Sequence, residues 1–100
     1  MKFGKMLAEM NKLHLLCTRT VNILERKLPV KLGPILIRLL YMPYGTILEL
    51  RDLDENQIKY LVQYNSFMIY YPGMGLKALR ELQIALEEYQ RYTQPSDEVC

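Results

Sequence analysis

The feature that most constrains this chain is the regular spacing of apolar residues along its first quarter. Between Phe3 and Leu28 the apolar positions recur in steps of mostly three and four, which is the period of one face of an α-helix. Pro29 follows directly and stops a helix. The pattern predicts one long amphipathic helix over residues 3–28, and its apolar stripe consists of Phe3, Met6, Leu7, Met10, Leu13, Cys17, Val21, Leu24 and Leu28.

A helix of this length spans roughly 37 Å at about 1.5 Å per residue, which exceeds the width of a compact domain of 100 residues. Part of the stripe should therefore contact a partner, and Phe3, Met6 and Met10 are the residues expected to do so. Phe3, Met10, Cys17 and Leu24 also form an imperfect heptad seam. A homodimer through this seam is an alternative to packing on the chain's own helices.

A capping motif marks the start of a second helix. The side chain of Asp54 can accept a hydrogen bond from the backbone of Gln57, and the Gln57 side chain can accept one in return, so a helix should begin at Glu55. Its end is open, because the aromatic and β-branched run Phe67–Tyr71 suits either a strand or a continued helix. The expected core stripe of this helix is Ile58, Leu61 and Val62.

The remaining segments predict a small helical bundle of the mainly α class. Ile35–Met42 is a short apolar run that fits two helical turns, or alternatively a buried strand. A short hairpin between residues 44–50 and 67–71 is an alternative for the middle of the chain. A final amphipathic helix follows the glycines near residue 75. We expect a single helical domain over residues 1–92 and a flexible tail over residues 93–100.

The spacing of the elements between residues 32 and 74 resembles a winged helix-turn-helix, with residues 55–64 as its recognition helix. The resemblance implies a DNA-binding transcriptional regulator, in which Asn56, Gln57 and Lys59 would contact the nucleic acid. Asp52 and Asp54 lie beside that helix and would repel phosphate. Protein contact is therefore preferred to DNA contact, and DNA binding stays as the alternative function.

The opening residues 1–5, together with Leu7, are similar to the start of SPX domains, which bind inositol phosphates through lysines. The similarity covers only these positions. The chain contains no Trp, and its second half carries five basic against eight acidic residues, where an SPX domain has a Trp and a lysine-rich surface. We take no function from the similarity.

Catalytic and metal-binding patterns are missing from the sequence. His14 is its only histidine, so a histidine metal cluster is impossible. Cys17 should be buried on the apolar stripe and Cys100 is the last residue, which makes a bridge between them improbable and indicates a reducing, cytoplasmic compartment. We therefore expect a non-enzymatic protein without cofactor. Every apolar run is far shorter than the roughly 20 residues that span a bilayer, so no membrane partner is expected.

A row of aromatic residues suggests where a partner binds. If residues 55–71 were helical throughout, aromatic side chains at steps of four, three and four would share one face beside the core stripe. Tyrosine is frequent in interfaces because its ring provides apolar area while its hydroxyl tolerates water, although the same rings could also fill the core. We predict a protein–protein interaction or regulatory subunit, an adaptor or homodimer, that uses Phe3, Met6, Met10, Tyr60, Tyr64, Phe67 and Tyr71.

Overall fold

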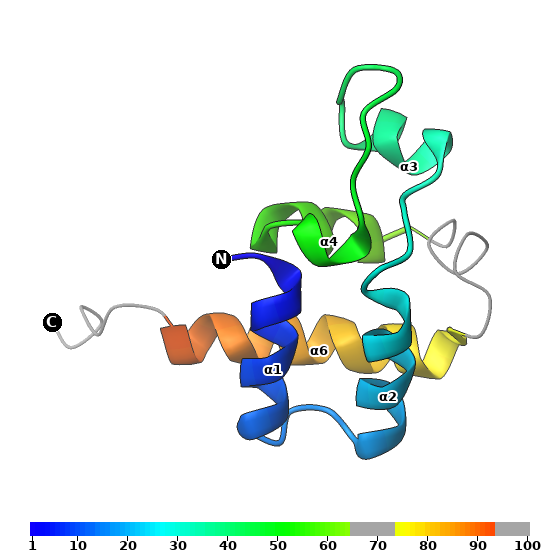
Figure 1. Ribbon diagram of the computed structural model, residues 1–100. Coiled ribbons are helices and arrows are strands. Elements are labelled where there is room, and N and C mark those ends of the chain that lie inside the picture. The colour runs from blue at the N-terminus through cyan, green and yellow to red at the C-terminus, as the bar shows by residue number, and fades with distance from the viewer. Residues whose placement is uncertain (65–73, 94–100) are drawn as a thin grey trace, which may run out of the picture.

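The first quarter of the chain forms two helices. The computed structural model describes residues 1–64 and 74–93, with α1 spanning Phe3–Lys12 and α2 spanning Thr18–Lys27 (Figure 1). The two helices pack against each other and are joined by a short connection. The prediction of one continuous helix over residues 3–28 is wrong. The apolar periodicity did not reveal the break, because both helices turn their apolar faces toward the same core.

A specific helix-ending motif separates α1 from α2. His14 adopts the left-handed conformation, with φ at 57°. Its N–H donates to the carbonyl of Asn11, and the N–H of Leu15 donates to the carbonyl of Met10, both at 3.0 Å. These are the two backbone bonds of a Schellman motif, which is usually built on a glycine. The chain therefore reverses its direction at a hydrogen-bonded helix cap, although no glycine marks this cap in the sequence.

The structure is mostly helical, as predicted, and the part of the chain that it describes contains no β-strand. Residues 48–50 run antiparallel to residues 30–32, with hydrogen bonds from the Leu32 N–H to Leu48 and from the Leu50 N–H to Val30. The predicted hairpin partner, residues 67–71, lies outside the described residues. After α2 the remaining elements are α3 (Pro34–Leu39), the 3-10 helix η1 (Leu50–Asp52), α4 (Glu55–Val62) and α6 (Leu76–Thr93).

The winged-helix interpretation is not confirmed. It requires a second helix over residues 46–52, before the recognition helix, but residues 46–49 are not helical. The capping motif at the start of α4 is confirmed. The Gln57 N–H donates to Asp54 Oδ1 at 2.8 Å, and the Asp54 N–H donates to Gln57 Oε1 at 3.0 Å. The helix begins at Glu55, as this local motif predicts. Local side-chain chemistry was sufficient to place this boundary.

The core forms where α1 meets α2, η1 and α4, while α4 packs on α6. The start of α1 is tied to the start of α4 through a hydrogen bond of 2.7 Å from the Phe3 N–H to the Leu53 carbonyl. Figure 1 shows α6 crossing both α1 and α2. The Tyr89 hydroxyl of α6 donates to Glu9 of α1 at 2.6 Å. Burial, followed by this hydrogen bond, raises the pKa of Tyr89 to about 12.

Glu81 of α6 caps the N-terminus of α2. Its carboxylate accepts hydrogen bonds from the Cys17 backbone N–H at 2.8 Å, from the Cys17 thiol at 3.5 Å and from the Thr20 hydroxyl. Burial favours a higher pKa for Glu81, but the hydrogen bonds from Thr20 and Cys17 and the charge of Lys77 hold this pKa below its ordinary value of 4.5. The prediction that Cys17 is buried is wrong, because the break before α2 makes Cys17 its exposed N-cap residue.

Replacing Glu81 by Gln should lower the free energy of unfolding at neutral pH by about 1 kcal/mol, the size of a lost helix cap. Because the pKa of Glu81 is lower in the folded than in the unfolded chain, its contribution is complete above a pH of about 4.5 and is lost as the pH falls through the folded-state value.

Urea unfolding at about pH 7 and about pH 3 measures this effect, and the difference between wild type and Glu81→Gln should shrink at the lower pH. Glu87→Gln makes the same change at an exposed position of α6 and should leave the unfolding midpoint unchanged. A difference that is equal at both pH values would contradict the role of the ionised cap.

Candidate interaction surface

Exposed apolar side chains concentrate on one segment, residues 30–47. This segment comprises the strand-like residues after α2, then α3 and the loop that follows it, and it projects from the rest of the fold at the top of Figure 1. Apolar residues scattered singly over a surface are ordinary, whereas a concentration of them marks a site of interaction. The large exposed apolar side chains of this segment are Val30, Ile35, Tyr41, Tyr44 and Ile47.

Tyr41 is held in an unfavourable backbone conformation at the end of α3. Its φ is 59°, and its N–H donates to the Arg38 carbonyl at 2.9 Å, while the Met42 N–H donates to the Ile37 carbonyl at 3.2 Å. This is a second Schellman motif, and a left-handed residue other than glycine costs roughly 1–2 kcal/mol. The side chain gains little burial in return, because it is 88% exposed.

Three tyrosines, Tyr41, Tyr60 and Tyr64, form a cluster that we call the tyrosine surface. The rings of Tyr41 and Tyr60 are 6.4 Å apart between centroids, and those of Tyr60 and Tyr64 are 5.1 Å apart in an edge-on arrangement. Hydrogen bonding with Tyr64, and then with Tyr41, raises the pKa of the Tyr60 hydroxyl. Tyr60 is half-buried against the core, so it supports the two more exposed rings.

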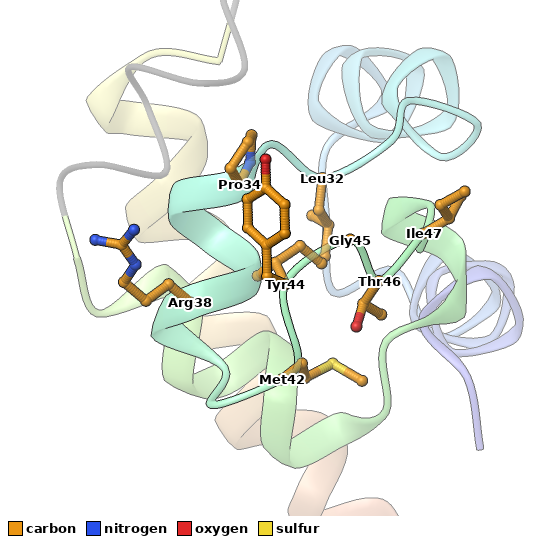
Figure 2. A pocket seen from close by; sticks show the side chains of 9 residues that line it. Leu32, Pro34, Arg38, Met42, Tyr44, Gly45, Thr46 and Ile47 are labelled. Atoms are coloured by element: carbon orange, nitrogen blue, oxygen red, sulfur yellow. The ribbon is translucent and has the colours of Figure 1, made fainter.

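A cavity of about 370 Å³ lies between α3 and the loop that follows it, and we call it the groove (Figure 2). Buried Leu32 and Ile37 contribute to its lining from below the surface, while Tyr44 and Ile47 are exposed. In Figure 2 the Arg38 side chain extends to the side of α3 away from Ile47. The groove is lined by Leu32, Pro34, Ile37, Arg38, Met42, Tyr44, Gly45, Thr46 and Ile47.

The loop that forms one wall of the groove has a defined conformation. The Thr46 N–H and hydroxyl both donate to the Pro43 carbonyl, at 3.1 and 2.6 Å. Gly45 has a φ of 89°, which is the conformation that a tight turn demands of glycine at this position. Pro43 and Gly45 are residues typical of turns, and the turn they form fixes this wall, so the groove exists before any partner binds.

The residues expected to bind a partner fall into three groups. Three are fully buried in the core, because the break after α1 turns its apolar face inward, and these are Phe3, Met6 and Met10. Two lie in the tyrosine surface, with Tyr60 half-buried and Tyr64 38% exposed. The other two, Phe67 and Tyr71, lie outside the described residues. The structure brings together only Tyr60 and Tyr64 from this set.

The residues expected to contact nucleic acid are largely engaged within the fold. The side chain of Gln57 belongs to the cap of α4. Lys59 Nζ donates to Gln90 Oε1 at 2.6 Å and lies 4.0 Å from a carboxylate oxygen of Glu55. Asn56 is exposed. This face of α4 therefore presents few free donors to a phosphate backbone.

In the part of the chain that the structure describes, no hydrogen bond joins His14 to Cys17. His14 is exposed on the connection between α1 and α2, and the Cys17 thiol contacts Thr20 and Glu81, not an imidazole. Residues 1–64 and 74–93 contain no group of three side chains that could hold a metal ion. Within the same residues, no helix combines the length and the apolar character that crossing a bilayer requires.

Tyr41, Tyr44 and Ile47 were not among the residues predicted to contact a partner. Nothing in the helical periodicity marks them, since they follow a short helix and lie in a turn. The sequence signal that could have found this surface is its composition, since residues 26–48 contain four basic residues, no acidic residue and tyrosines at a turn.

Comparison of the chain with protein-family models, with curated proteins and with solved structures finds no match.

Two substitutions at one position test the strain at Tyr41. Tyr41→Gly and Tyr41→Ala both remove the ring, but only glycine adopts a φ of 59° freely. Tyr41→Gly should therefore be more stable than Tyr41→Ala by about 1 kcal/mol in urea unfolding. Equal stabilities would show that the left-handed conformation costs nothing here.

Proposed function

We propose that this protein is a non-enzymatic interaction or regulatory subunit that binds another protein through the tyrosine surface and the adjoining exposed side chains of Tyr44 and Ile47. The observation that carries the proposal is Tyr41, an 88% exposed ring on a left-handed backbone position that glycine would occupy at lower cost. Strain of this kind persists at binding sites, where the side chain is needed for something other than folding.

The composition of the surface supports a protein partner. Tyrosine rings provide large apolar area with few rotatable bonds, and such residues are frequent at the centre of protein interfaces. Tyr44 and Ile47, which are 94% and 74% exposed, extend the apolar area from the tyrosine surface along the loop. Together these side chains form the candidate interface, in contrast to the α4 face, whose Gln57 and Lys59 already have partners within the chain.

A matched pair of glycine variants tests this function. Tyr41→Gly and His14→Gly both relieve a left-handed residue, and both sites end a helix, but only the first removes a ring of the tyrosine surface. Figure 1 shows the connection between α1 and α2 and the loop after α3 at opposite ends of the fold. Immobilised Tyr41→Gly should capture its partner from an extract of the source cells at least about tenfold less well than wild type, the loss expected for an interface anchor.

His14→Gly should capture the partner as well as wild type does, and both variants should keep the helical circular dichroism. Tyr64→Ser provides a second test at the exposed edge of the tyrosine surface. Undiminished capture by both Tyr41→Gly and Tyr64→Ser would refute the proposal. Light scattering of the purified protein shows whether the partner is instead a second copy of this chain.

The alternative, DNA binding through α4, makes a separate prediction. Phosphate contacts dominate the affinity for duplex DNA at low salt and weaken steeply as salt rises. Because Lys59 is engaged by Gln90 and Glu55, we expect no binding of random duplex DNA at about 50 mM salt, measured by fluorescence anisotropy. Binding at this salt that is lost in Lys59→Gln would favour the DNA-binding function.

A further inference from the structure

The groove beside α3 combines an apolar lining with a single cation at its side. Most of its lining residues are apolar, and among the described residues that line it Arg38 is the only charged one. Arg38 is exposed, and no carboxylate lies within ion-pair distance of it in the described part of the chain. A ligand that fills the groove meets apolar surface, and one that also reaches over α3 meets the Arg38 guanidinium, which extends to the side of the helix away from Ile47.

The segment that forms the groove, together with the residues just before it, carries charge of one sign. Residues 26–48 contain four basic residues, Arg26, Lys27, Lys31 and Arg38, and no acidic residue. The nearest acid along the chain after this segment is Glu49, which lies across from Lys31 and pairs with Arg51 at 2.8 Å. The local field therefore attracts negative charge, which favours an acidic partner over a basic one.

The groove is also preformed, because hydrogen bonds within the chain fix its walls. The turn at Pro43 and Thr46 fixes one wall, and the hydrogen bond of 2.8 Å from the Leu32 N–H to the Leu48 carbonyl ties the loop back to the chain before α3. A partner that enters a preformed groove loses less free energy to ordering the protein. The volume of about 370 Å³ accommodates one or two apolar side chains of a peptide.

We propose that the groove binds an acidic segment of another protein, which inserts an apolar side chain between α3 and the loop, passes over α3 and places a carboxylate against Arg38. This proposal rests on the interaction function proposed above and names the partner's chemistry. A nucleic acid would supply the negative charge but would leave the apolar lining without a matching group. A bilayer surface cannot enter a concave site of this size.

Peptide selection tests the proposal without knowledge of the natural partner. A phage-displayed library of random peptides of about 12 residues is selected on the immobilised full-length protein, and recovered sequences are synthesised with a fluorescein label for anisotropy measurements. The recovered peptides should be enriched in both Asp or Glu and large apolar residues. Amide resonances of Gly45 and Thr46, which line the groove, should shift on binding.

Two variants address the two halves of the proposed contact. Ile47→Asp places a charge beside the apolar lining, and Arg38→Glu reverses the rim charge, so each should weaken the recovered peptides by about tenfold or more. Selection on Arg38→Glu should recover basic peptides instead. Lys5→Glu is the control, since it makes the same charge reversal at an exposed position of α1 that does not line the groove and should leave affinity unchanged.

The remaining outcomes overturn the proposal. They are selection without acidic enrichment, binding unaffected by Ile47→Asp, and tighter Arg38-dependent binding of oligo-dT or of phosphatidylserine vesicles than of the recovered peptides. If partner capture from extract survives Ile47→Asp and Arg38→Glu but is lost in Tyr41→Gly, the interaction function stands and the groove proposal alone is wrong. If capture survives all three variants, both proposals are wrong.

Discussion

The reversal at His14 is the constraint on which the rest of the fold depends. By ending α1 with two backbone hydrogen bonds to Asn11 and Met10, it allows α2 to pack beside α1 and not to extend beyond it. The apolar faces of both helices then cover one core, and Phe3, Met6 and Met10 become fully buried. Glu81 completes the arrangement, because its carboxylate caps the helix that the reversal creates.

The two left-handed residues have the same geometry and different surroundings. His14 and Tyr41 each end a helix in a Schellman motif without glycine, at φ values of 57° and 59°. At His14 the motif allows α1 and α2 to pack on one core. At Tyr41 it presents an aromatic ring to solvent while that ring contacts Tyr60. The cost of a left-handed tyrosine is roughly comparable to one good interface contact, so binding is a physically sufficient reason to retain it.

The candidate surface joins two sources of affinity. The tyrosine surface offers apolar rings whose hydroxyls tolerate water. The groove offers an apolar cavity beside Arg38, which has no ion-pair partner among residues 1–64 and 74–93. Charge brings an acidic partner toward the correct face, while apolar burial determines how long it stays. None of the four basic side chains of residues 26–48 forms an ion pair within the described part of the chain, so their charge is available to a partner.

Local chemistry in the sequence determined the helical class and the final helix through the apolar period. It also determined the start of α4 at Glu55 through the capping side chains, and the turn at residues 43–45 through its glycine. Each of these signals acts over only a few residues.

Only the tertiary structure decided that the first helical stretch is two helices, since a helix end without glycine leaves the apolar spacing intact. Only it decided that Cys17 is exposed, that Glu81 caps a helix 64 residues earlier, and that Tyr41 meets Tyr60. These contacts depend on how distant segments pack, and no local pattern records that.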